Sequence, residues 1–303
     1  MRRKQFDVLN TTRINESELL REVNIEISVL KSLDIFTNAH VQGVVKVTLA
    51  ICKKMDMKYE EIKKCVISAY LHDIGKIRIS PDILQKTSKL TDEEYEEMKN
   101  HTIYGYEMCM EYPTFHEYAR IVRAHHENLD GTGYPDGLRG KEIPDEASLI
   151  KVADVYDALT QRRQYKEGFA KSEALRIMLE DVKRGKMSAT YYEGLIFAVF
   201  DELEENYNNL EINIKKYEDN LEILHDLETI YKQIYDRGLT PKLEKKLRKF
   251  ELAPGYDMST NANLLIMKQK ALEREKQELK KCKEEISNIT KIQKELYRSK
   301  IKR

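Results

Sequence analysis

Five histidines and two aspartates follow one another through residues 40–154, and any fold of this chain must account for their order. They are His40, His72 and Asp73 in HDIGK, His101, His125 and His126 in HHENLDGTGYPDGL, and Asp154 in KVADVYDAL. The two remaining histidines of the chain are His116 and His225. Neutral imidazole is a ligand that Fe, Mn, Co and Zn accept, and a carboxylate can bridge two ions. The seven side chains are therefore enough to hold two transition metals if the fold gathers them.

The composition favours long helices. The chain has 303 residues, of which 34% are charged, 12 are Gly and 6 are Pro, and Trp is absent. So few turn residues argue against an all-β protein. No run of alternating polar and apolar residues precedes position 200. We therefore predict an all-α domain over residues 1–200, a bundle of helices.

Apolar residues at helical spacing predict four helices within this domain. They run from about 15 to 30, from 60 to 75, from 120 to 126 and from 148 to 159. The second is expected to carry His72 and Asp73 on its last turn, because Gly75 would end it. Thr91 reads as the N-cap of a further helix that leads to His101. The Gly-rich stretch 130–140 is expected to form a loop.

The last third of the chain has two heptad patterns. The first comprises Leu203, Leu210, Tyr217, Leu224 and Tyr231, and the second comprises Leu265, Leu272, Leu279 and Ile286. They predict a coiled-coil-like extension over 201–303, with an acidic helix over 201–236, a linker over 237–262 and a basic helix over 263–303. Helices of opposite charge are expected to pair, within one chain or across a dimer. The alternative is a solvated charged face that pairs with nothing.

Several classes of protein are disfavoured by the rest of the composition. The four cysteines are scattered, which is typical of free thiols in a reducing compartment. The basic N-terminus lacks the apolar run of a signal peptide, and no apolar segment reaches membrane-spanning length. The formal net charge is zero, so no global attraction to a nucleic acid polymer is expected. These features predict a cytoplasmic protein without a membrane span.

The order of the histidines and aspartates resembles that of the HD phosphohydrolases, and Gly133-Tyr134-Pro135 narrows the resemblance to the HD-GYP family, which cleaves cyclic di-GMP. The likeness covers about residues 30–180. It implies that His40, His72 and Asp154 hold one metal, that His101, His125 and His126 hold the other, and that Asp73 bridges the two. The implied cofactors are two divalent transition metals, Fe or Mn. They would turn a bridging water into a hydroxide that attacks phosphorus.

The resemblance also suggests catalytic roles for Lys76, Asp73 and Asp157. Lys76 in HDIGK would offset charge on the phosphoryl oxygens, unless it is an ordinary solvated lysine. Asp73 would act as the bridging ligand. Asp157 would either take part in proton transfer to the leaving group or orient a metal ligand. Some family members have a third-metal glutamate where this chain has Phe36, so we expect two metals.

Three residues are the candidates for substrate contacts. Tyr134 offers a ring and a hydroxyl, or else its loop only supports the histidine pair. Arg163 and Lys166 lie at the family positions that contact the dinucleotide, although Gln164 replaces the usual proline. A fork of Arg with a Lys suits phosphate and guanine. The alternative is a surface charge run.

The predicted function is a phosphodiesterase that opens cyclic di-GMP to linear pGpG, with onward cleavage to GMP left open. A second hypothesis is another HD phosphohydrolase activity, on cyclic GMP-AMP or another nucleotide. A third is a receptor that binds a cyclic dinucleotide without cleaving it and signals through its helical tail. The expected partner is a cyclic dinucleotide, or another nucleotide under the second hypothesis, and residues 201–303 are expected to join a second copy or a partner protein.

Overall fold

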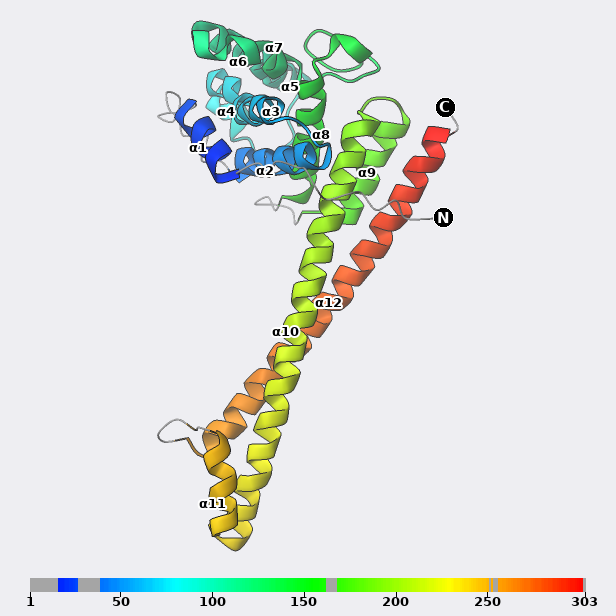
Figure 1. Cartoon of the computed structure of the whole chain (residues 1–303). Helices are drawn as coiled ribbons and strands as arrows, with labels where there is room; N and C mark the ends of the chain where they lie inside the picture. The colour runs from blue at the N-terminus through cyan, green and yellow to red at the C-terminus, as the bar shows by residue number, and fades with distance from the viewer. Residues whose placement is uncertain (1–15, 27–38, 162–167, 251, 253–255, 302–303) are drawn as a thin grey trace. The chain divides into compact units, whose positions relative to one another are not determined.

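The all-α prediction is confirmed by the structure, a computed structural model that describes residues 16–26, 39–161, 168–250, 252 and 256–301 (Figure 1). Within these ranges the chain forms helices and turns, without strands, and one isolated bridge joins Asp130 to Arg139. The chain divides into two compact units. One comprises Met1–Val199 with Ile292–Arg303, and the other comprises Phe200–Lys291.

The first unit is a bundle of mostly short helices. They are α1 (Glu16–Glu26), α2 (Ala39–Lys54), α3 (Tyr59–Leu71), α4 (Pro81–Leu84), α5 (Asp92–Lys99), α6 (His101–Glu111), α7 (His116–Ala124), α8 (Asp145–Thr160), α9 (Lys171–Lys183) and the first turns of α10 (Ala189–Arg237). Three 3₁₀ turns, η3 (Ile74–Arg78), η4 (Pro113–Phe115) and η5 (Gly140–Glu142), lie between them. No helix of the described ranges is long and apolar enough to cross a membrane.

The core of this unit lies where α2, α3 and α8 pack on one another, with α7 against α3. Ile51 of α2, Val66 of α3 and Leu149 of α8 are fully buried there. Each such side chain contributes about 1.5–3 kcal/mol on burial. The same three helices carry or adjoin His40, His72 and Asp154, so the packing that stabilises the fold also brings these polar side chains together.

Helix α2 (Ala39–Lys54) was not predicted from the sequence. Its sequence AHVQGVVKVTLAICKK contains Gly43, several valines and a threonine, all of which have low intrinsic helix propensity. The helix forms because one face, including Val41, Val44 and Leu49, is buried against the rest of the unit. Tertiary packing therefore overrides local propensity at the helix that holds His40.

The predicted end of the helix before HDIGK was wrong. Helix α3 ends at Leu71 with His72 as its C-cap, and Gly75 does not terminate it but lies inside the 3₁₀ turn η3. The glycine is needed for another reason. A Cβ at position 75 would lie 2.0 Å from the carbonyl oxygen of His101 and 2.4 Å from the amide nitrogen of Gly105. Gly75 thus lets the backbones of η3 and α6 approach closely.

Other predicted elements are confirmed. Thr91 caps α5, and its hydroxyl accepts from the amide of Glu94 while Glu94 accepts from the amide of Thr91. The stretch 130–140 contains no α-helix, and α8 spans the predicted helix that carries Asp154. Of the first predicted helix, Glu16–Glu26 is helical, and the remainder lies outside the described residues.

Within the second unit, the parts of α10 and α12 (Met258–Ile301) that belong to it form an antiparallel pair of helices (Figure 1). The Cys282 thiol donates to the carbonyl of Leu203, and buried Asn261 donates to the carbonyl of Leu224 at 3.0 Å. Lys276 and Glu218 form an ion pair at 3.0 Å. The expected pairing of opposite charges is therefore found within the chain. The segment expected as a linker contains a helix, α11 (Pro241–Leu247), capped by Thr240.

The close approach at Gly75 gives a prediction for stability. Gly75→Ala should destabilise the protein by about 1–3 kcal/mol, because backbone atoms rather than a flexible side chain occupy the space of the new methyl group. Thermal unfolding measures the change. Gly194→Ala is the matched control, since its Cβ would meet mainly the flexible end of Met55, at 3.0 Å from Sδ. Equal midpoints for both variants would contradict the steric account.

Candidate metal centre

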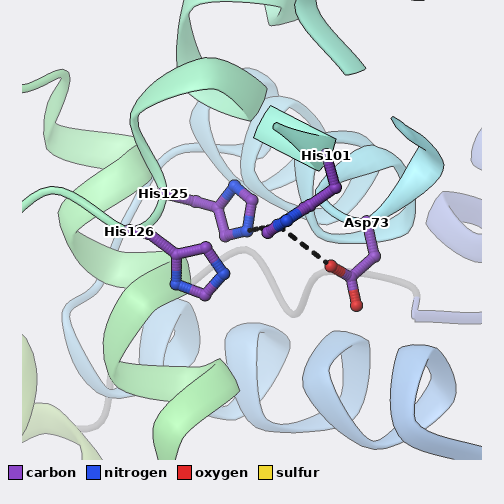
Figure 2. Close-up of side chains that lie close together, drawn as sticks. All are labelled: Asp73, His101, His125 and His126. Carbon is purple, nitrogen blue, oxygen red and sulfur yellow. Dashed lines mark hydrogen bonds and ion pairs between the residues drawn. The ribbon is translucent and has the colours of Figure 1, made fainter. Parts of the chain in front are cut away.

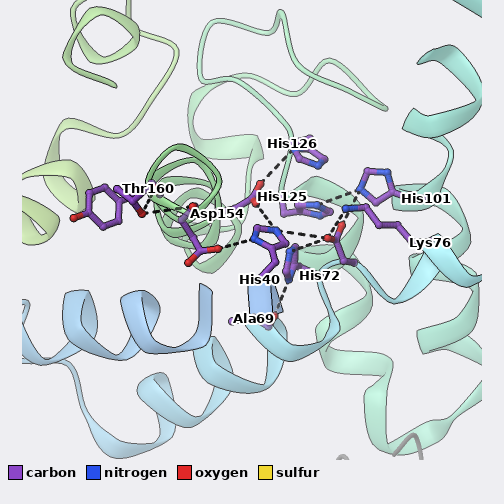
Figure 3. Close-up of polar contacts among 12 residues, drawn as sticks. His40, Ala69, His72, Lys76, His101, His125, His126, Asp154 and Thr160 are labelled. Atoms are coloured by element: carbon purple, nitrogen blue, oxygen red, sulfur yellow. Dashed lines mark hydrogen bonds and ion pairs between the residues drawn. The ribbon is translucent and has the colours of Figure 1, made fainter. Parts of the chain in front are cut away.

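The fold brings together all seven of the side chains that the sequence singled out (Figure 3). In the described part of the chain, two groups of potential ligands each have atoms within 4.8 Å of one another. They are Asp73, His101, His125 and His126 (Figure 2), and His40, His72 and Asp73. Asp73 belongs to both groups, so its carboxylate lies between two possible ion positions. Asp154 adjoins both, with its oxygens 3.1 Å from His40 Nε2 and 4.0 Å from His126 Nδ1.

Three of the histidines are oriented by the backbone of the segment that precedes them. The acceptors lie three residues earlier, at Ala69 for His72 (2.7 Å), at Met98 for His101 (2.7 Å) and at Val122 for His125 (2.6 Å). A carbonyl oxygen can only accept, so each Nδ1 must carry a proton, and in the neutral form of each ring the lone pair is on Nε2. Each histidine sits at a helix end, where the carbonyls of the last turn are open to such bonds.

The Nε2 lone pairs of these rings are positioned to bind a cation. The Nε2 atoms of His101 and His125 lie 3.4 Å apart and both rings already donate through Nδ1, so two lone pairs face each other. Nε2 of His72 is buried without a hydrogen bond, although it lies 3.3 Å from Asp73 Oδ2. Buried polar atoms without partners are costly. Metal ions at the two ligand groups would satisfy these nitrogens, one ion for His101 and His125 and another for His72.

The protonation states also suit metal binding. Burial lowers the pKa of His125 well below its usual value, lowers that of His101, and lowers that of His126 to about 3, so these rings are neutral at pH 7. Burial alone would raise the pKa of both aspartates. Positive charge at His72 and Lys76 nevertheless holds the pKa of Asp73 well below its usual range, and the bond to His40 holds that of Asp154 at about 2.

His40 sits among carboxylates. Its Nδ1 donates to Asp157 Oδ2 at 2.7 Å, and its Nε2 lies 3.1 Å from Asp154 Oδ1 and 3.8 Å from Asp73 Oδ2. Burial opposes protonation of this ring, but the carboxylates of Asp154 and Asp157 outweigh it and raise the pKa of His40 to about 9. So much negative charge around one imidazole favours a cation at this end of the cluster.

The contact with His40 favours one of the two roles considered for Asp157. Its side chain is buried and engaged with Nδ1 of His40, which is the arrangement of a residue that orients a ligand. Gly43, one turn after His40, makes room for it. A Cβ at position 43 would lie 1.9 Å from Asp157 Oδ1. The motif His40-Val41-Gln42-Gly43 thus contributes a positioning element that the sequence analysis did not anticipate.

Lys76 is held at the cluster rather than directed only into solvent. Its Nζ donates to Asp73 Oδ2 at 2.5 Å, and 36% of its side chain is exposed (Figure 3). The ammonium therefore keeps Asp73 ionised while remaining partly accessible from outside. This geometry supports the functional interpretation of the lysine in HDIGK over that of an ordinary surface residue.

The loop that contains Gly133-Tyr134-Pro135 is tied to the histidine pair by Glu127. This buried carboxylate accepts from three successive amides, those of Asp136 at 2.6 Å, Gly137 at 3.0 Å and Leu138 at 3.1 Å. The ring of Tyr134 lies against His126 with its centroid 4.8 Å away. The loop therefore supports His126, whatever else it contacts. Glu127 was noted in the sequence only as part of the motif.

Lys151 is a second residue that the sequence analysis missed. Its Nζ donates to the carbonyl of His126 at 3.1 Å. Burial lowers the pKa of Lys151 to about 8 against the opposing effect of Asp154. Its position one turn before Asp154 on α8 was the available signal. Arg163, Lys166 and Phe36 lie outside the described residues.

Comparison with known proteins identifies the family. The HD domain family matches residues 23–190. The chain is 38% identical over 153 residues to the cyclic di-GMP phosphodiesterase response regulator RpfG of Xanthomonas campestris. The aligned region covers 50% of this chain and 40% of that protein. This chain belongs to the HD domain family, as an HD-GYP protein.

Other relatives of this HD-GYP protein include a 3'3'-cGAMP-specific phosphodiesterase 1 of Vibrio cholerae, 29% identical over 187 residues, with 61% of this chain and 43% of that protein covered. Among solved structures, Bd1817, an HDG"Y"P protein from Bdellovibrio bacteriovorus, aligns with a TM-score of 0.46 and 24% identity, over 59% of this chain and 58% of that one. The HD-GYP protein spans about two fifths of the length of the two curated relatives.

The role of Asp157 can be tested by metal affinity. Asp157→Ala should weaken Mn²⁺ binding by about 10–100-fold, because His40 loses the acceptor that orients it. Asp157→Asn should lie between this variant and the unaltered protein, since the amide oxygen can still accept. Competition titration with a chelator measures the affinity, and Asp219→Ala, an exposed position of α10, is the control. Unchanged affinity with lowered turnover would instead assign Asp157 to proton transfer.

Proposed function

We propose that this chain is a metal-dependent phosphodiesterase that hydrolyses cyclic di-GMP to linear pGpG. The two groups of ligands around Asp73 would hold two divalent ions, Fe or Mn. His40, His72 and Asp154 would serve one ion, and His101, His125 and His126 the other. Mixed imidazole and carboxylate donors suit these metals.

One observation carries the proposal. Nε2 of His101 and Nε2 of His125 face each other at 3.4 Å, in rings whose other nitrogens are both engaged as donors. A scaffold that only binds a nucleotide has no need for two opposed lone pairs in a buried site. The shared position of Asp73 in both ligand groups supports two ions rather than one.

Divalent ions held in this way would activate a water for in-line attack on phosphorus and offset the charge that develops on the phosphoryl oxygens. The reaction adds one water: a bond forms between phosphorus and the water oxygen, the bond to one ribose oxygen breaks, and that oxygen leaves with a proton. Lys76 supplies a fixed cation beside Asp73, suited to a phosphoryl oxygen. Asp157 keeps His40 oriented.

Substrate recognition involves three further residues. We propose that Arg163 and Lys166 pair with the phosphates and guanine of the dinucleotide. Tyr134 already packs against His126, so its hydroxyl edge rather than its full face is the part suited to the substrate. The names of the relatives include phosphodiesterases for cyclic di-GMP and for 3'3'-cGAMP, which makes the mixed ring the second candidate substrate.

The experiment is a turnover assay on protein purified without oxygen. The full chain with Mn²⁺ or Fe²⁺ should convert cyclic di-GMP to pGpG, as measured by chromatography, and should be compared with cyclic GMP-AMP and pGpG as substrates. Asp73→Ala should lower turnover by more than about 100-fold, because it removes a ligand shared by both groups, a larger loss than that of an orienting residue.

Asp226→Ala, an exposed aspartate of α10, should leave turnover unchanged. Faster cleavage of cyclic GMP-AMP would move the assignment to the mixed ring. Tight binding of cyclic di-GMP without cleavage in the presence of either metal would contradict the proposed phosphodiesterase activity and favour the receptor hypothesis.

A further inference from the structure

A cation lies between two aromatic rings beside the histidine cluster. Nζ of Lys99 is 5.0 Å from the ring centroid of Tyr95 and 5.6 Å from that of Tyr134. Tyr95 and Lys99 belong to α5, one turn apart, whereas Tyr134 belongs to the loop after the histidine pair. The two tyrosines thus come from separate segments and meet around one ammonium group.

This group of residues adjoins the candidate metal centre. Tyr134 lies against His126 with centroids 4.8 Å apart, and its centroid is 6.4 Å from that of His101. Lys99 comes two residues before His101, whose ring is fixed to the carbonyl of Met98. A ligand held by the metal centre would therefore have Tyr134, Lys99 and Tyr95 in succession along one edge.

Packing does not explain the aromatic residue at position 95. Helix α5 has no buried residue, and 49% of Tyr95 is exposed. The ring is a large apolar surface left open next to a polar site. Exposed aromatic rings of this kind are suited to stacking on nucleobases, and each stacked base is worth about 1–3 kcal/mol.

The ammonium group of Lys99 can exchange its present ion-pair partner for another anion. Its partner is Glu96 at 2.6 Å, whose side chain is 69% exposed, and such surface pairs contribute little. A phosphate, with its greater charge, can replace Glu96 as the partner of the ammonium. A lysine is a compact cation well suited to a phosphate oxygen.

We propose that Tyr95 and Lys99 form a nucleotide subsite at the edge of the metal centre. Tyr95 stacks on one purine base of the cyclic dinucleotide, and Lys99 pairs with the phosphate that is not being cleaved. This inference rests on the proposed function and adds the residues that hold the distal half of the substrate. Tyr95 and Lys99 bind the substrate and take no part in the chemical step.

The test is steady-state kinetics of the full chain with cyclic di-GMP. Tyr95→Ala should raise KM by about 5–100-fold with kcat nearly unchanged, the result expected when binding to substrate and transition state is lost equally. Tyr95→Phe keeps the ring and should stay within about twofold of the unaltered protein. Lys99→Met should also raise KM, and Lys99→Arg should restore most of the loss. Tyr235→Ala, at an 85% exposed position of α10, is the control and should change nothing.

A second substrate distinguishes a role of Tyr95 in substrate binding from a structural role. Methyl p-nitrophenyl phosphate, a phosphodiester without a purine or a second phosphate, should be cleaved equally by Tyr95→Ala and the unaltered protein, with equal metal content. An unchanged KM for cyclic di-GMP in Tyr95→Ala would overturn the subsite while leaving the enzyme intact. Equal losses on both substrates would also overturn it, in favour of a structural role. Absence of turnover by the unaltered protein would overturn the proposed function and this inference with it.

Discussion

Hydrogen bonds from buried imidazole Nδ1 atoms to backbone carbonyls determine how the candidate metal ligands are oriented. His72, His101 and His125 each donate to the residue three positions earlier, and each then directs an Nε2 lone pair inward. Because the accepting carbonyls belong to the backbone, the orientation of the rings depends on where the helices end. Burial keeps the rings of His101 and His125 neutral, and the opposed lone pairs then favour a cation between them. The positions of the helix ends therefore determine whether the site can bind a cation.

The helix ends converge because the surrounding backbone is tightly packed. Gly75 allows η3 to approach the first turn of α6, so Asp73 and His101 come to lie with the carboxylate 3.5 Å from the imidazole Nε2. Gly43 leaves room for Asp157 beside His40, and Glu127 fixes the loop whose Tyr134 packs against His126. Small residues and buried carboxylates therefore position the candidate ligands, and substitutions at these places should affect the candidate metal centre without removing a ligand.

The sequence predicted the fold class, the capped start of α5 and the helix that carries Asp154, because each depends on local signals. It did not predict α2, whose valines and glycine conceal a helix that exists through packing. It misplaced the end of α3, since a glycine required for close backbone approach looks the same in sequence as one that ends a helix. The candidate ligands were found by their order, whereas the contact of Asp157 with His40, 117 positions apart, depends on tertiary structure. Tyr95 was not singled out because an exposed aromatic residue on a polar helix carries no pattern of its own.

The central claim is that the cluster holds two ions with Asp73 between them. Crystals of the full chain grown with Mn²⁺, with diffraction data collected on both sides of the manganese absorption edge, test it most directly. We expect two anomalous peaks, one bonded to His101, His125 and His126 and the other bonded to His40, His72 and Asp154, each in contact with Asp73. A single peak, or peaks away from these side chains, would contradict the two-metal assignment.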